Sequence, residues 1–154
     1  MKRIRTAMIG PVAAVLLAGC ASTPSGEAFS RLVEPRAERA LLYLYRPDDH
    51  YGMALKFAVV VDGKEKGDIG HAAYMIIPVD PGKHTIQIHG LGYKDEPKEL
   101  DTYKGAIEFL RVATAKGFGG FSATLTLEAE GSSKAVTDLA GLKREPERFL
   151  DEEL

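Results

Sequence analysis

The sequence predicts an all-β fold, a single antiparallel β-sandwich of about seven strands, with a short C-terminal helix as an optional addition. Runs of apolar or alternating residues recur between strong turn signals from residue 40 onward. The composition, with 16 glycines, 8 prolines and no tryptophan in 154 residues, suits short strands and many turns better than a helical bundle. One domain with a hydrophobic core is therefore expected.

The N-terminal segment has the layout of an export signal. A basic start is followed by the apolar run 7–18 and then by Leu17-Ala18-Gly19-Cys20. This last motif resembles the lipobox of bacterial lipoproteins. The resemblance implies cleavage between Gly19 and Cys20, alkylation of the Cys20 thiol with diacylglycerol and acylation of the new N-terminus, with palmitate as a typical chain. An uncleaved membrane helix is the alternative, but the apolar run is short of the ~20 residues that spanning needs.

The predicted organisation follows from this motif. Residues 1–19 are the signal peptide, 20–39 the lipid anchor and tether, 40–142 the β-sandwich and 143–154 a charged tail or short helix. Within the tether, Phe29, Leu32 and Val33 fall at helical spacing and predict an amphipathic turn that packs on the domain, with insertion into the membrane interface as the alternative.

Three strands are predicted at the start of the domain. Residues 40–46 are apolar on both faces, which is typical of a strand buried between two layers. The strand 55–61 ends at Asp62-Gly63, a strong signal for a type I′ hairpin turn because both central residues of that turn have positive φ. The return arm, 64–69, is short and charged, so we expect it at the edge of a sheet.

A tight turn separates the next two strands. In Asp80-Pro81-Gly82-Lys83, proline presets φ at the second position and glycine tolerates positive φ at the third. Strand 73–79 precedes this turn, and Pro78, which lacks an N–H, is expected at a strand end or edge. In the strand 84–89 that follows, Ile86 and Ile88 share one face.

These turn motifs resemble those of a known family. The run VVVDGK at 59–64, followed by Gly67, by VDPGKHTIQI at 79–88 and by Gly92-Tyr93, resembles the PEGA-type domains of bacterial surface proteins. With the lipobox in front and Tyr43-Leu44-Tyr45-Arg46 in the first strand, the chain resembles an uncharacterised family of small bacterial lipoproteins with a PEGA-like domain. The resemblance covers about residues 40–94. It implies a transthyretin-like or immunoglobulin-like sandwich and supplies no catalytic residues.

The second half of the domain is less regular. The sequence predicts a long connection over residues 90–104, and a helix that starts at Lys98 is the alternative. It predicts a strand over residues 106–114. Residues 116–120 predict a hairpin loop. In the strictly alternating run 121–130, Leu125 and Leu127 are expected to face the core.

The last part of the chain offers weaker signals. After the turn 131–133, residues 135–139 predict a last short strand. Pro146 stands where a terminal helix could begin, ahead of Phe149 and Leu150. A frayed tail is the alternative.

The sequence contains no recognisable catalytic or phosphate-binding motif, so we expect a protein that is not an enzyme and has no cofactor or metal. His84 and His89 have opposite parity on one strand and cannot bind a metal together. The turn Asp48-Asp49-His50 could collect a divalent ion with ligands from elsewhere. It is the basis of the alternative function, a small envelope hydrolase or metal-binding protein, although a solvated turn is the simpler interpretation.

Tyr93 and Tyr103 are the candidate partner contacts. They flank the charged run 94–101, whose mixed signs are typical of a solvated loop. Long loops on rigid sandwiches often carry recognition, and aromatic side chains often anchor it. Packing of both tyrosines against the sandwich is the alternative.

Charge limits the classes of partner. Loss of the first 19 residues removes Lys2, Arg3 and Arg5 and no acidic residue, which moves the formal net charge from −2 to −5 and disfavours nucleic acid. Ala21, rather than an aspartate, follows the cysteine, and by resemblance to the lipoprotein sorting rule this implies the periplasmic face of the outer membrane. We therefore expect a lipid-anchored, non-enzymatic binding or scaffold module for a periplasmic protein or cell-wall partner. A carrier of small apolar ligands between the sheets is a further alternative, disfavoured by side chains that would fill such a cavity.

Overall fold

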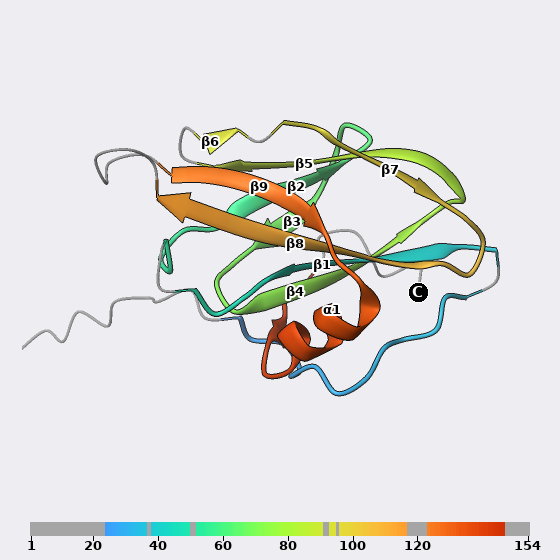
Figure 1. Ribbon diagram of the computed structural model, residues 1–154, viewed down its shortest axis with the longest axis horizontal. Helices are drawn as coiled ribbons and strands as arrows, with labels where there is room; N and C mark the ends of the chain where they lie inside the picture. The colour runs from blue at the N-terminus through green and yellow to red at the C-terminus, as the bar shows by residue number, and fades with distance from the viewer. Residues whose placement is uncertain are drawn as a thin grey trace, which may run out of the picture.

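Two β-sheets pack face to face, and a helix and an extended segment cover the outer face of one of them (Figure 1). The computed structural model describes residues 24–36, 38–49, 52–90, 93–94, 96–116 and 123–146. None of the helices in these ranges is both long enough and apolar enough to cross a membrane. The fold is mostly β, as the sequence predicts.

The first sheet has the strand order β10-β4-β1-β8-β9. Its strands are β1 (Ala40–Arg46), β4 (Ala73–Val79), β8 (Ile107–Lys116), β9 (Ala123–Ala129) and β10 (Lys143–Arg144). Every residue of β1 is buried, which confirms the prediction of a strand between two layers. Leu42 and Leu44 face the second sheet, and Tyr43 and Tyr45 face the outer layer.

The first sheet is mixed, so the prediction of a purely antiparallel sandwich is wrong. β1 pairs with β8 in parallel, and β4 pairs with β10 in parallel. The cause is the path of the chain. After β4, which ends beside the start of β1, the chain forms β5, β6 and β7 of the second sheet and then returns to the same end of the first sheet. Gly105 N donates to Arg39 O over 3.0 Å at this return, so β8 starts beside the start of β1.

The second sheet has the order β3-β2-β5, with β7 and β6 lying one after the other along the far edge of β5. Its strands are β2 (Phe57–Val61), β3 (Lys64–Ile69), β5 (Gly82–Gly90), β6 (Tyr93–Lys94) and β7 (Lys98–Thr102). Asp62 and Gly63 both have positive φ, 51° and 75°, which confirms the predicted hairpin. The predicted connection 90–104 contains β6 and β7, and the strand predicted from residue 106 is β8.

The outer layer includes the helix α1 (Ser132–Leu139). The prediction of a strand at 135–139 is therefore wrong. Ala135 and Leu139 are four residues apart and both buried, which is the spacing of one helical face, and Thr137 donates its hydroxyl to Ser133 O over 3.0 Å. Residues 143–144 form β10, and any helix after Pro146 falls outside the described residues.

An extended segment, residues 24–36, forms the rest of the outer layer, and we call it the strap. It is drawn in blue beside α1 in Figure 1. Phe29 N donates to Leu142 O over 2.9 Å, and the Phe29 ring meets the Tyr74 ring edge to face with centroids 5.8 Å apart. Phe29 and Leu32 thus pack on the domain, as predicted, but no helical turn forms.

Buried charges secure one end of the sandwich, which we call the Arg46 end. The side chain of Arg46 is 1% exposed and donates from Nη1 to Leu55 O over 2.7 Å and from Nη2 to Gly52 O over 2.8 Å. Burial lowers the pKa of this guanidinium. Nearby, Lys56 Nζ lies 3.2 Å from the buried carboxylate of Glu145. Removing one partner from such a buried network is costly, so these contacts hold the β1–β2 connection and the end of β10 in place.

The strap can be tested through Gly26. An added Cβ at this residue would lie 2.0 Å from Arg144 O, far inside contact distance. We expect Gly26→Ala to lower the free energy of unfolding by about 1–3 kcal/mol, and to speed hydrogen exchange of the Phe29 amide. Ser25→Ala, on the adjacent exposed residue, is the control, with an expected change within about 0.5 kcal/mol. Chemical denaturation and amide exchange measure both effects, and an undisturbed Phe29 amide in Gly26→Ala would contradict the docking of the strap.

Candidate binding surface

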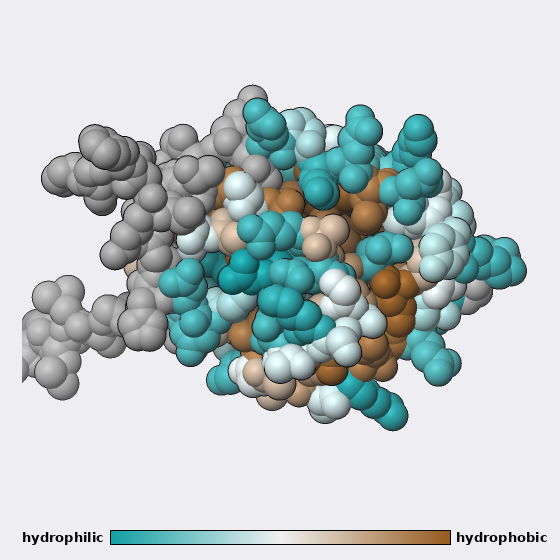
Figure 2. All heavy atoms as spheres, in the orientation of Figure 1, coloured by the Kyte–Doolittle hydropathy of each residue, from teal (hydrophilic) through white to brown (hydrophobic). Residues whose placement is uncertain are grey.

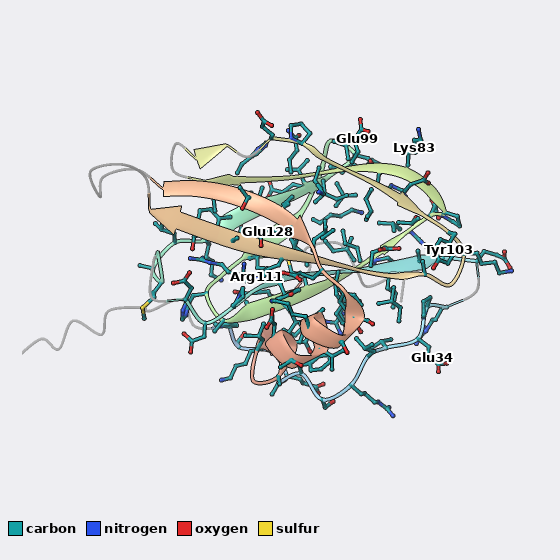
Figure 3. All side chains as sticks on the ribbon, viewed as in Figure 1. Glu34, Lys83, Glu99, Tyr103, Arg111 and Glu128 are labelled. Carbon is teal, nitrogen blue, oxygen red and sulfur yellow. The ribbon has the colours of Figure 1, made fainter. Side chains whose placement is uncertain are left out.

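An exposed tyrosine stands at the end of the sandwich opposite Arg46. Tyr103 follows β7 directly and is 70% exposed. Figure 3 shows its ring projecting beyond the ends of the strands. A single exposed aromatic side chain is ordinary on a protein surface, and what distinguishes Tyr103 is the turn that holds it.

The turn that carries Tyr103 is fixed by backbone hydrogen bonds. Ala106 N donates to Tyr103 O over 3.0 Å, and Leu41 N donates to Ala106 O over 2.9 Å. Gly105 adopts φ 76°, a left-handed conformation that suits glycine. The turn is thereby locked to the start of β1, so the tyrosine is presented from a rigid base.

Charged pairs surround this turn. Lys104 pairs with Glu38, and Arg39 Nε lies 3.5 Å from Asp80 Oδ1. The hydroxyl of Thr102 donates to Asp80 O over 3.1 Å. We call this region the Tyr103 end; it comprises the turn 103–105, residues 38–39 and the β4–β5 turn. Figure 3 shows Lys83 and Glu99 on the outer side of the second sheet, on β5 and β7.

A histidine joins two turns at this end. His84 Nδ1 lies 2.7 Å from Asp62 Oδ2, and His84 Nε2 lies 2.6 Å from Asp80 O. A carboxylate and a carbonyl only accept hydrogen bonds, so both ring nitrogens donate when the imidazole is protonated. Burial lowers the pKa of His84, but the bonds to Asp62 and to the Asp80 carbonyl outweigh it and raise the pKa above its usual value.

An open groove of about 370 Å³ runs beside His84, between side chains of β5 and β7. Its lining mixes both signs of charge, with Lys83 from β5 and Glu99 and Asp101 from β7. On the face drawn in Figure 2, apolar areas are likewise broken up by hydrophilic side chains. This end therefore presents a single exposed aromatic side chain within a polar surround and no broad apolar patch on the drawn face.

The family model described as "Protein of unknown function (DUF2846)" matches residues 36–122. The chain belongs to the DUF2846 family. The match contains β1 to β8 and the whole Tyr103 end, whereas α1, β10 and nearly all of the strap lie outside it. Neither the comparison with curated proteins nor the comparison with solved structures gave a match.

The structure separates the two tyrosines that the sequence proposes as partner contacts in this DUF2846 protein. Tyr93, in β6, lies opposite Gly90, which is the last residue of β5. Tyr103 follows Thr102, which lies opposite Gly82, the first residue of β5. These positions on β5 are about 26 Å apart. The backbone of Tyr93 is described and its side chain is not, and the proposed cleavage and lipidation residues Gly19 and Cys20 lie outside the described residues.

The two described residues of the predicted metal-binding turn have separate partners. Asp48 Oδ1 lies 3.0 Å from His71 Nε2, and Asp49 Oδ2 accepts from the Thr114 hydroxyl over 3.4 Å. The third residue, His50, is outside the described residues. Within the part of the chain that the structure describes, no three His, Cys, Asp or Glu side chains form a group that could hold a metal ion.

Sequence reasoning did not find the buried charges or the His84 bridge. Arg46 carries the one usable signal, a charged residue at the end of a wholly apolar strand. The partners of His84 are 22 residues away at Asp62 and four residues away at Asp80, and only the folded turns bring them together.

The His84 bridge predicts a pH dependence. Because the pKa of His84 is raised, its contribution to stability is complete below the unfolded value of about 6.5 and is lost as pH rises through the folded pKa. Burial raises the pKa of Asp62, but its hydrogen bonds to His84 and to the Thr85 N–H lower the pKa by more, so the net shift is downward. The contribution of Asp62 to stability is therefore present above the unfolded pKa of about 3.8 and is lost as the pH falls through the lower folded pKa. We expect Asp62→Asn to lower the pKa of His84, measured by NMR titration of the imidazole. Asp101→Asn, on the neighbouring strand, is the control; an equal decrease there would contradict a specific bridge.

Proposed function

We propose that this protein is a lipid-anchored, non-enzymatic binding module of the bacterial envelope, which presents its Tyr103 end to a periplasmic protein or cell-wall partner. The exposed, rigidly held Tyr103 carries the proposal, because preorganised aromatic side chains make good binding anchors. The resemblance of residues 40–94 to PEGA-like, transthyretin-like domains supports a binding role rather than a catalytic one.

The packing of the strap sharpens this proposal. Pro24 is buried, and Cys20 precedes it by four residues, which reach at most about 14 Å when fully extended. A lipid on Cys20 therefore holds the domain close to the outer-membrane surface instead of on a long tether. The domain faces the periplasm in this arrangement.

If Cys20 carries the lipid, the path of the strap supports placing the Arg46 end nearest the membrane. Ala28, in the strap, forms a β-bridge with Lys143, and Lys143 pairs with Ala73. Ala73 is the first residue of β4 and pairs with Arg46. The first part of the strap therefore lies at the Arg46 end. The strap then runs along the sheet (Figure 1), and Arg36 O at its end accepts a hydrogen bond over 3.2 Å from the N–H of Arg39 at the Tyr103 end. The six steps from the first to the last residue of β4 span about 20 Å between the two ends. The anchored protein thus directs Tyr103 away from the bilayer.

Lipidation is tested on Cys20. Cells grown with labelled palmitate should yield a labelled protein that lacks its first 19 residues and is found in the outer-membrane fraction. Cys20→Ser should abolish the label and the cleavage between residues 19 and 20, because the thiol is the acceptor. An unlabelled chain, or one that keeps its N-terminus, would refute the anchoring.

The recognition surface is tested by photo-crosslinking in intact cells. A benzophenone side chain at position 103 should give a defined adduct, whereas the same group at Met53, which is 52% exposed at the Arg46 end, should not. An excess of unlipidated protein should compete the adduct away, and the same excess of the Tyr103→Ala variant should not. Equal adducts at both positions, or equal competition by both proteins, would contradict recognition through Tyr103.

A further inference from the structure

The His84 bridge is complete only when the imidazole is charged. His84 Nδ1 lies 2.7 Å from Asp62 Oδ2, and His84 Nε2 lies 2.6 Å from Asp80 O. An ionised carboxylate and a carbonyl only accept hydrogen bonds, whereas a neutral imidazole has a single N–H. The side chain of His84 is 11% exposed, so little water reaches the ring to replace a lost partner.

Loss of the proton breaks the bond to Asp80 and leaves the bond to Asp62. A carboxylate is a stronger acceptor than a backbone carbonyl, so the remaining proton stays on Nδ1. The lone pair of Nε2 then faces the Asp80 carbonyl oxygen, and two acceptors at 2.6 Å repel each other. Asp62 also accepts from the Thr85 N–H over 2.8 Å, which keeps its carboxylate in place. The Asp80 carbonyl is therefore the group that moves.

The Asp80 carbonyl is shared with the strand that leads to Tyr103. Thr102 is 5% exposed, and its hydroxyl donates to Asp80 O over 3.1 Å. Gly82 O lies 3.4 Å from the same hydroxyl and offers it a second acceptor. When Asp80 moves, the single hydroxyl proton can turn to Gly82. Thr102 directly precedes Tyr103, so this exchange of partners acts on the base of the exposed tyrosine.

The side chain of Asp80 provides a second connection to the same turn. Arg39 Nε lies 3.5 Å from Asp80 Oδ1, and Arg39 O accepts from Gly105 N over 3.0 Å. Tyr103 O accepts from Ala106 N over 3.0 Å. The β4–β5 turn is thus connected to both sides of the turn 103–105.

Imidazole is the side-chain class that ordinarily titrates near neutral pH, and the charged groups around His84 belong to other classes. On β7, Leu100 pairs opposite His84 and has an acidic residue on each side. The charged residues on the elements around the imidazole are carboxylates, amines and one guanidinium: Asp62, Asp80, Glu99, Asp101, Lys66, Lys83 and Arg39. A response of this region between pH 5.5 and 8.5 therefore reports His84.

We propose that protonation of His84 fixes the β4–β5 turn and, through Thr102 and Arg39, the turn that presents Tyr103, and that deprotonation loosens both. Burial lowers the pKa of His84, but the bonds to Asp62 and to the Asp80 carbonyl raise it by more, so the change occurs above the ordinary value of about 6.5. In the function proposed above, acid then strengthens recognition through Tyr103. The coupling itself is a property of the free protein, so its failure and the failure of Tyr103 recognition are separate results.

NMR titration of the full mature chain carrying Cys20→Ser tests this coupling between pH 5.5 and 8.5. We expect the amides of Gly82, Thr102 and Tyr103 to shift with the same midpoint as the His84 imidazole. The protection factor of the Ala106 amide should fall about fivefold above that midpoint, the equivalent of one net hydrogen bond. Turn amides that stay constant while His84 titrates would overturn the proposal.

Variants on the two sides of the bridge make the test specific. Asp62→Asn touches neither Asp80 nor Thr102, yet it should lower the midpoint of the turn amides by the same amount as it lowers the pKa of His84. In His84→Gln, which cannot titrate, the turn amides should not change with pH. Thr102→Val should leave His84 titrating and reduce the pH-dependent shift of the Tyr103 amide.

His89→Gln is the matched control, because His89 lies five residues further along β5, about 17 Å away. It should leave the midpoint of the turn amides unchanged. Turn amides that still titrate in His84→Gln, or whose midpoint follows His89→Gln and not Asp62→Asn, would assign the pH response to another group and refute the role of His84.

Discussion

The burial of β1 on both faces is the constraint on which the rest of this structure depends. A strand at the centre of a two-layer sandwich needs only one apolar face, and polar residues can occupy the other. Here Leu42 and Leu44 face the second sheet while Tyr43 and Tyr45 face outward, and all four are 0% exposed. A third layer must cover the outward face, and the strap and α1 are that layer. The outer layer is therefore a structural requirement of β1 and not an appendage.

The two tyrosines also specify how this outer layer docks. A buried phenol needs a partner for its hydroxyl. The Tyr43 hydroxyl accepts from Val33 N in the strap, and the Tyr45 hydroxyl donates to Asp138 in α1 over 3.1 Å. Burial raises the pKa of both phenols, so they stay neutral and keep these bonds. One strand thus positions one segment from each side of the family-matched region.

Local chemistry explains which parts of the fold could be predicted from the sequence. The Asp62-Gly63 turn, the alternation of Ile86 and Ile88 and the two-sided burial of β1 each depend on a few adjacent residues, and all three are confirmed. The parallel pairing of β1 with β8 depends on where the chain re-enters the sheet, which no local pattern records. Residues 135–139 contain β-branched side chains at Val136 and Thr137 that favour a strand, but burial of Ala135 and Leu139 on the outer face prevails. The bridge from His84 to Asp62 and to Asp80 joins two separate turns, so only the fold reveals it.

The same geometry separates two roles in space. The Arg46 end is dense in internal contacts, because Arg46 binds the carbonyls of Gly52 and Leu55 and Lys56 binds Glu145, so its charges are already used for stability. At the Tyr103 end, the charged pairs are exposed, and such pairs contribute little to stability and can exchange partners at small cost. In the function that we propose, with an anchor near the first end and an aromatic contact at the second, the sandwich would act as a rigid spacer, because the strap is hydrogen-bonded to the domain at Glu27, Phe29 and Val33. Rigid presentation lowers the entropy lost on binding, so the proposed function would favour recognition at a fixed distance from the membrane over capture by a mobile tether.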